Sequence, residues 1–344
     1  MAIGPVNWDK VFTDQSKVGL EHYRRIPYGQ PLLDDHLRYV KDEGHSDQWQ
    51  NIEFVRQLGS GSFGTVWEVT TRQKLKKDGL RKIMFWQKWE NLRLACKVMT
   101  YFYNGRGNIR SCVNILLADM QRLQFLKHDN IVKYVDFIGI PDPLTGFPYS
   151  RVLMLMELCN GDINSFIRST NYMSEKEIVK WLRHIAKALV YLHNDNRMVH
   201  LDIKPLNILY KNRFGGKRIY KLGDFGLAIA YEPGQPMEET NFPGGTTAYV
   251  APEFFPAPGQ RHGPIGQLGK TVTTPPCDIY SAGATVVNCL IGNTFYRGRN
   301  ARNQLHQLAS SVSPEFRQLI DEMLAVDPQQ RPDAQTLLHR IRQL

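Results

Sequence analysis

Three polar residues stand close together in an apolar stretch of the chain. In VHLDIKPLNIL, residues 199–209, Asp202, Lys204 and Asn207 alternate with valine, leucine and isoleucine. A buried polar group costs free energy unless it has a partner, so folding alone does not favour this pattern. A carboxylate can accept a proton, an ammonium group can stabilise developing negative charge, and carboxylate and amide oxygens can bind Mg²⁺. The stretch is therefore a candidate catalytic loop.

Other segments supply further groups that phosphoryl transfer requires. Gly59, Gly61 and Gly64 form G-x-G-x-x-G, whose backbone amides can approach phosphate oxygens because no Cβ intervenes. Lys97 is bracketed by apolar residues in LACKVM, which suggests that its ammonium group reaches into a cleft. Asp224 stands between glycine and phenylalanine in GDFG and could bind a metal ion. A strand rather than a helix is expected after the glycines, which disfavours a dinucleotide site.

The surrounding pattern predicts the elements that must position these residues. Short β-branched and aromatic runs predict strands over 53–58, 65–70, 94–99, 131–137 and 151–157, and apolar spacing predicts a helix over 109–123. Ser174 and Glu177 form a capping box before a helical apolar face that extends to residue 192. Residues 314–341 are predicted to form two helices, broken at Asp327–Pro328. A small β-rich part thus precedes a larger helical part, with the boundary near residue 157.

Composition limits the class of protein. The chain has 344 residues and a net charge of +10. Residues 71–97 contain nine Lys and Arg and two acids, so a net charge of +7 lies in this segment. Its five cysteines include no C-x-x-C pair, which argues against zinc and disulfides and for a reducing compartment, cytoplasmic or nuclear. The first ten residues do not resemble a signal peptide. Polar residues and glycines dilute the uncharged stretch 279–296, so it is expected to be a buried core helix.

Residues 52–344 resemble a eukaryotic protein kinase domain. The motifs GSGSFGTV, ACK, HLDIKPLN, DFG, APE, CDIYSAG and QRP stand in the order of that family. The resemblance implies an α+β, bilobal protein-kinase fold, in which a small β-rich N-lobe with helix C precedes a larger, mainly helical C-lobe. The expected division is an N-terminal extension of unassigned role at 1–50, an N-lobe at 51–157 and a C-lobe at 158–344. The expected cofactors are ATP and Mg²⁺, and the expected partners are protein substrates.

The resemblance also implies a role for each matching catalytic residue. Asp202 would orient the substrate hydroxyl and accept its proton, and Lys204 would neutralise charge on the transferring phosphate. Lys97 would contact the α- and β-phosphates, while Asn207 and Asp224 would bind magnesium.

Further positions match the family's nucleotide-binding and structural residues. The expected ATP-binding residues are Gly59, Ser60, Gly61, Gly64, Val66, Ala95, Lys97, Met156, Glu157, Cys159, Asp162 and Leu209. Glu253 and Arg331 match a structural ion pair, and Asp278 matches the residue that braces the catalytic loop.

The expected acceptor is a serine or threonine hydroxyl. Lys204 followed by Pro205, with Thr246 in GTTAYVAPE, resembles the serine/threonine branch, and Thr246 is counted with the catalytic residues. The C-terminal half also resembles kinases that act at the top of mitogen-activated cascades, which leaves the subgroup unresolved.

Leu201 departs from the family pattern, which has an arginine there. That arginine binds an activation-loop phosphate together with two other cations, but Ile229 and Ile115 occupy the matching positions and Phe242 replaces the phosphorylated residue. We therefore expect an enzyme that does not need activation-loop phosphorylation.

Asp119 is a second departure. It falls where helix C of the family carries the glutamate that pairs with Lys97, and it is the only acid between Lys97 and Asp129. A shorter partner leaves open the alternative of a pseudokinase, kept as a scaffold or allosteric partner.

Two insertions complete the prediction. Residues 71–93 are basic and aromatic and could bind an acidic partner. The interpretation as a nucleic-acid-binding protein depends on this segment alone and is not favoured. Residues 254–276 lengthen the link between APE and Asp278, and a tolerated surface loop is the simpler interpretation of both insertions.

Overall fold

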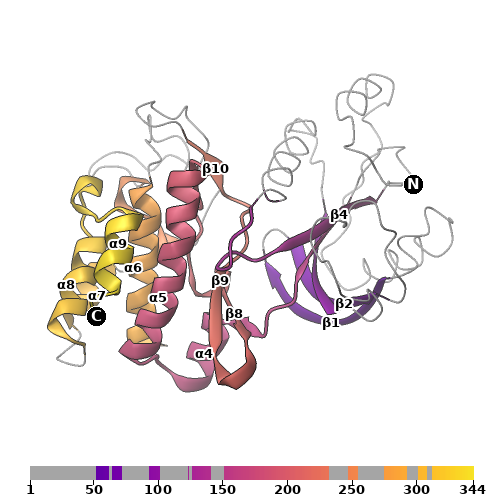
Figure 1. Cartoon of the computed structure of the whole chain (residues 1–344), viewed down its shortest axis with the longest axis horizontal. Helices are drawn as coiled ribbons and strands as arrows, with labels where there is room; N and C mark the ends of the chain where they lie inside the picture. The colour runs from indigo at the N-terminus through magenta and orange to yellow at the C-terminus, as the bar shows by residue number, and fades with distance from the viewer. Residues whose placement is uncertain are drawn as a thin grey trace. The chain divides into compact units, whose positions relative to one another are not determined.

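The computed structural model describes residues 52–61, 64–71, 93–100, 123, 126–140, 151–231, 247–254, 275–292, 301–307 and 312–344. The chain divides into two compact units (Figure 1). The first holds strands β1 to β5, and the second holds Leu126–Val132 and the chain from Cys159 onward. The division after Leu158 lies one residue from the expected lobe boundary. The α+β composition agrees with the predicted fold class.

The first unit is built on one antiparallel sheet. Its strands are β1 (Ile52–Gly61), β2 (Gly64–Thr71), β3 (Arg93–Thr100), β4 (Tyr134–Ile140) and β5 (Arg151–Glu157), in the order β1-β2-β3-β5-β4. Each coincides with a predicted strand except β4, which starts three residues later than expected.

The two faces of this sheet differ in character. The alternating residues Leu94, Cys96 and Val98 of β3 pack with Val69, Leu153 and Leu155 into a buried apolar cluster. Residues that pair directly across an antiparallel sheet share a face, and successive residues alternate. Because Val66 pairs with Lys97 and Ala95 pairs with Met156, the opposite face carries Lys97 and three other expected ATP-binding residues, Val66, Ala95 and Met156.

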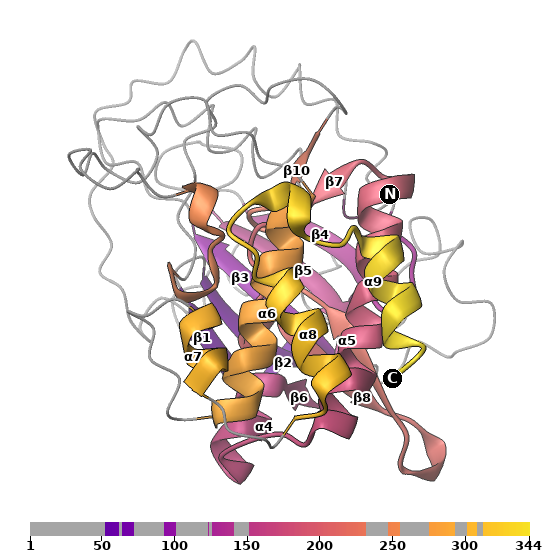
Figure 2. The ribbon, with the colours of Figure 1, turned by 90° about the vertical axis from the view of Figure 1, so that its left-hand side faces the viewer.

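The second unit is mainly helical. Its helices are α4 (Ile163–Thr170), α5 (Glu175–Val190), α6 (Pro276–Ile291), α7 (Ala301–Gln307), α8 (Pro314–Met323) and α9 (Ala334–Ile341). Figure 1 shows α5 beside both α6 and α9, and Figure 2 shows α7 and α8 against α6. The predicted break at Asp327–Pro328 is confirmed, because a 3₁₀ turn at Pro328–Gln330 separates α8 from α9.

Helix α5 starts where the sequence predicts. The Ser174 side chain accepts a hydrogen bond from the Glu177 backbone N–H. The Glu177 carboxylate does not close the capping box but accepts a hydrogen bond from Tyr220 Oη. The predicted apolar face, including Ile178, Trp181 and Ile185, is fully buried.

Helix α6 is the buried helix expected within 279–296. Every residue from Cys277 to Cys289 is buried, so the absence of charged residues after Asp278 reflects a position at the centre of the unit. Among the described residues, no helix is long and apolar enough to cross a membrane.

Short strands complete the second unit. Strands β6 (Gly161–Asp162), β8 (Ile208–Asn212) and β9 (Arg218–Leu222) form one sheet, and β7 (Met198–Val199) pairs with β10 (Ile229–Ala230).

Residues 126–132 differ from expectation because they pack with the second unit rather than the first. The Val132 N–H donates to Leu222 O at 2.9 Å, and the Leu222 N–H donates to Asn130 O at 2.8 Å. These bonds occupy the backbone groups that a longer β4 would have used, which explains its late start.

Candidate active site

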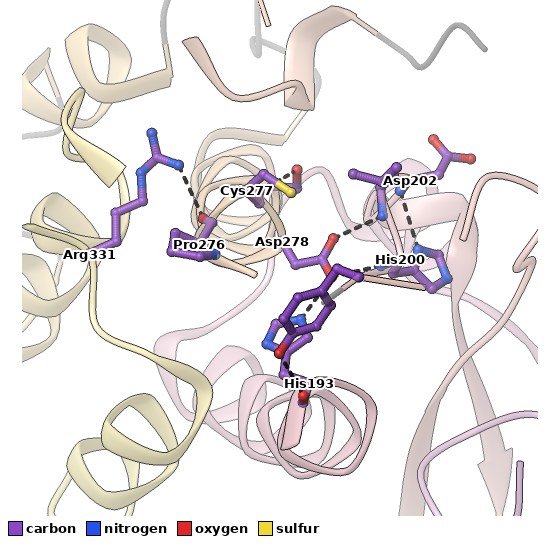
Figure 3. Close-up of polar contacts among 10 residues, drawn as sticks. His193, His200, Asp202, Pro276, Cys277, Asp278 and Arg331 are labelled. Carbon is purple, nitrogen blue, oxygen red and sulfur yellow. Dashed lines mark hydrogen bonds and ion pairs between the residues drawn. The ribbon is translucent and has the colours of Figure 1, made fainter. Parts of the chain in front are cut away.

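One buried carboxylate holds the candidate catalytic loop. Asp278, at the start of α6, accepts hydrogen bonds from the backbone N–H of His200 (2.8 Å) and of Leu201 (2.9 Å). Its Oδ2 also lies 2.9 Å from Nε2 of His193, which is in the π-helical turn Tyr191–Asp195 that follows α5. Figure 3 shows the Asp278 carboxylate directed at both histidines. The segment that contains His193, His200 and Leu201 is thus joined to the distant start of α6 at one side chain that is 0% exposed.

The surroundings of Asp278 keep it ionised. Burial by itself opposes ionisation, but the hydrogen bond and charge of His193, together with His200, hold the pKa of Asp278 below its ordinary value. His200 is also buried, and burial lowers its pKa below the ordinary value, so the ring is neutral near pH 7. The ring lies 3.1 Å from Gly223 O through Nε2, and Nδ1 accepts a hydrogen bond from the Asp202 backbone N–H at 3.2 Å.

The loop brings Asp202, Lys204 and Asn207 together. Lys204 Nζ lies 3.0 Å and 2.7 Å from the two carboxylate oxygens of Asp202. Asn207 Nδ2 donates to Asp202 O at 2.7 Å and to Asp202 Oδ2 at 2.8 Å. These bonds use only the nitrogen of the Asn207 amide, so its Oδ1 is the atom suited to a hard cation. The cluster fits a proton acceptor with a cation beside it.

Asp224 is tied to this cluster through its neighbour. The Gly223 N–H donates to Asn207 O at 2.9 Å, which places the GDFG segment against the end of the catalytic loop. A Cβ at Gly223 would lie 3.1 Å from side-chain atoms of both Leu209 and Val132, so glycine permits this close approach. Asp224 itself has φ 56°, a left-handed conformation that aspartate adopts more readily than most residues. A carboxylate and an amide oxygen form the ligand set that Mg²⁺ prefers, so the residues present fit this ion.

Leu201 occupies a left-handed position with φ 64° and is 7% exposed. Asp278 stabilises this conformation by accepting from its N–H. Beyond Asp224, Ile229 pairs with Val199 between β10 and β7. The Tyr231 N–H donates to Arg197 O at 2.8 Å, and Tyr231 Oη donates to His193 O at 2.7 Å. The chain after GDFG is therefore held to the catalytic loop by backbone pairing and one phenol.

In the first unit, the predicted residues lie on β1, β2, β3 and β5. Gly61 pairs with Gly64, and Gly59 pairs with Val66, so the glycine segment is the turn end of the β1–β2 hairpin. Ser60 lies in β1, and Lys97 is 7% exposed in β3. At the end of β5, Glu157 makes two hydrogen bonds with Lys133. The Glu157 backbone N–H donates to Lys133 O, and the Lys133 backbone N–H donates to Glu157 Oε1, each at 2.9 Å.

The remaining nucleotide-binding candidates lie in the second unit. Asp162 caps α4, since its Oδ1 accepts from Ser165 N at 2.7 Å and its Oδ2 from Ser165 Oγ at 3.1 Å. Leu209 lies in β8 opposite Lys221, and Cys159 is half-buried.

Glu253 and Arg331 form a bidentate pair. Nη1 and Nη2 of Arg331 each donate to one oxygen of Glu253 at 2.7 Å. Arg331 also donates to Ala325 O at 2.8 Å and to Pro276 O at 3.1 Å (Figure 3). Its side chain is 0% exposed, and through Arg331 the APE segment is linked to the start of α6.

Several predictions lie outside the described residues. These are Asp119 and Ile115 of the expected helix C, Thr246, Phe242, the extension 1–50, and residues 72–92 and 255–274 of the two insertions.

Sequence reasoning missed His193, His200 and Tyr231. His193 meets Asp278 across 85 positions, and Tyr231 meets His193 across 38. No local pattern indicates such contacts. The available signal was that His200 stands between Val199 and Leu201 in an otherwise apolar stretch.

Comparison with known proteins adds independent information. The model of the family described as "Protein kinase domain" matches residues 52–341. Cyclin-dependent kinase 9-A of Xenopus laevis is 25% identical over 289 residues, which cover 81% of this chain and 67% of the relative. The "Probable serine/threonine-protein kinase nek2" of Dictyostelium discoideum is 28% identical over 303 residues (83% and 61%). The Wee1-like protein kinase of Arabidopsis thaliana is 28% identical over 301 residues (86% and 50%). The chain thus spans between half and about two thirds of these relatives.

Proposed function

Because the chain belongs to the protein kinase domain family, we propose that it transfers the γ-phosphate of ATP to serine and threonine hydroxyls of proteins. The observation that carries this proposal is the cluster of Asp202, Lys204 and Asn207 on a loop braced by Asp278. The serine/threonine resemblance of the sequence and the name of the Dictyostelium relative support the choice of acceptor.

The residues of the cluster have distinct tasks in this proposal. Asp202 accepts the proton of the attacking hydroxyl, and its contacts with Lys204 and Asn207 fix the direction of its carboxylate. Lys204, 17% exposed, stabilises negative charge on the phosphate in transfer. Asn207 Oδ1 and the Asp224 carboxylate would hold Mg²⁺, which neutralises phosphate charge when bound. Lys97 supplies a second cation to the phosphates.

The finer part of the proposal is that transfer needs no activation-loop phosphate. Leu201 puts a buried apolar side chain where the family has a phosphate-binding arginine. The Ile229–Val199 pair and the two bonds of Tyr231 anchor the following segment without using charge. These contacts support an activation segment that is ordered at its start in the unmodified protein.

The test measures transfer from labelled ATP to a peptide library with serine, threonine or tyrosine acceptors. We expect label on serine and threonine, and a loss of at least about 100-fold in Asp202→Asn, because a general base contributes 10²–10⁴. Glu315→Gln, at an exposed carboxylate of α8, is the matched control and should keep full activity. Absence of transfer in both wild type and Asp202→Asn would favour the scaffold alternative.

Phosphatase treatment tests the finer part separately. The treated wild-type enzyme should keep its rate within about twofold. A large loss that is reversed by rephosphorylation would contradict the proposal while leaving the kinase assignment intact.

A further inference from the structure

A cavity opens beside the first turns of α5, on the surface of the second unit. It measures about 640 Å³ and is lined by Glu175, Lys176, Val179, Lys180, Arg183 and Leu344. This volume lies within the range of small-molecule sites, roughly 300–1,000 Å³. None of its lining residues belongs to the catalytic loop, so it is a separate feature.

Three cations line one side of this cavity. Lys176, Lys180 and Arg183 are spaced by four and three residues, which puts them on the same face of a helix. With a rise of 1.5 Å per residue, the row extends about 10 Å along the axis. One phosphate group is too small to contact all three, whereas an anion with several phosphates can.

The nearby acids are engaged elsewhere. Glu175 accepts hydrogen bonds from Ser313 N (2.8 Å) and Ser313 Oγ (2.5 Å). Glu177 accepts from Tyr220 Oη and lies at the longer distance of 3.7 Å from both Lys180 and Arg218. The positive charge at the cavity is therefore only weakly compensated.

Two further observations concern the groups beside the cavity. Arg183 Nε is buried and has no hydrogen-bond partner among the described residues, although an unpaired charged donor is costly to bury. The pKa of the neighbouring His184 falls to about 4, first because of burial and then because of the nearby positive charges of Lys187, Lys180 and Arg183, of which the last two line the cavity. An anion in the cavity would reduce this positive field.

We propose that the cavity at the start of α5 binds an organic anion carrying two or more phosphate groups. The guanidinium of Arg183 provides planar, paired donors for one phosphate, and the two ammonium groups contact the others. The site does not depend on catalysis, so its ligand is a second ligand beside the phosphoryl donor.

Calorimetric titration with inositol hexakisphosphate as the probe, in magnesium-free buffer, tests this site. The double variant Lys180→Gln/Arg183→Gln should bind at least about 25-fold more weakly, because each charged contact accounts for roughly fivefold or more. Arg168→Gln is the matched control, since it removes a cation from an exposed position in the last turn of α4, outside the cavity lining. It should bind within about twofold of wild type.

The other outcomes are equally informative. Equal affinity in the double variant and wild type, or an equal loss in Arg168→Gln, would overturn the proposal in favour of diffuse charge attraction. A hexaglutamate peptide that binds more tightly than the probe would replace it with an acidic protein segment. Inorganic phosphate should bind at least about 25-fold more weakly than the probe. Should the double variant fail to fold, Lys176→Gln, at an exposed position, should weaken probe binding about fivefold, and no change would refute the site.

Discussion

Replacement of Asp278 by asparagine should strongly destabilise the second unit. The side chain is 0% exposed and serves three donors: His200 N–H, Leu201 N–H and His193 Nε2. Asparagine has one acceptor oxygen, so at least one backbone N–H becomes buried and unpaired, and the surviving bond loses its charge. An unpaired buried donor costs about 1–3 kcal/mol, and a hydrogen bond to a charged group contributes about 1.5–3 kcal/mol. The expected loss is therefore about 3–5 kcal/mol.

This loss is a large part of a typical stability of about 5–15 kcal/mol. Urea unfolding followed by tryptophan fluorescence measures it, since Trp181 on α5 is fully buried and reports on this unit. Asp202 follows directly after the two anchored residues, so kcat should also fall in conditions where the variant is folded.

Asp321→Asn is the control for Asp278→Asn. Asp321 forms a bidentate pair with Arg302 at 2.7 and 2.6 Å, but it is 30% exposed. Its replacement should cost at most about 1 kcal/mol, as for other surface pairs. If Asp278→Asn unfolds within about 1 kcal/mol of wild type, the bracing role inferred from the geometry is wrong.

Three further predictions follow from other contacts. Glu253→Gln should lower the free energy of unfolding by about 2–4 kcal/mol, because it leaves the buried Arg331 without its charge partner; an unchanged urea midpoint would contradict this. Tyr231→Phe removes the donor to His193 O and should cost about 0.5–1.5 kcal/mol and several-fold in kcat, whereas equal rates would show that the phenol does not position the segment. His184 has a pKa of about 4 in the folded protein against 6.5 ordinarily, so the unfolded chain binds more protons between these values and stability falls as pH drops through that window. The Tm of His184→Gln should fall less steeply from pH 7 to 5, and parallel curves would refute this assignment.

Local patterns predicted most of the elements. The alternation in β3 and the apolar face of α5 arise from periodicities of 2 and 3.6 residues, which any short window contains. The Ser174 cap is equally local. By contrast, β7 and β10 have two residues each, too few for a periodic signal, and their pairing joins Val199 to Ile229.

The site was predictable in its residue types but less so in its supports. Asp202, Lys204 and Asn207 meet because six consecutive positions of one loop contain them all. The contact of His193 with Asp278 depends on the packing of α5 against α6. The position of residues 126–132 in the second unit depends on their backbone hydrogen bonds with Leu222. Such partners are selected by tertiary structure, which a single sequence does not reveal.

The left-handed leucine at position 201 also limits how this protein can evolve. An arginine there would keep the left-handed backbone conformation and would place a charge at a position that is 7% exposed. The residue that pairs with Val199 between β10 and β7 is Ile229, which carries no charge. By the family pattern, a phosphate-dependent switch would need new cations in place of Leu201, Ile115 and Ile229 and a hydroxyl residue in place of Phe242. An arginine at position 201 alone would bury a charge without a phosphate partner, so it would lower stability without conferring regulation. Phosphate-dependent control is therefore several substitutions away from this sequence, and the first of them at position 201 is unfavourable by itself.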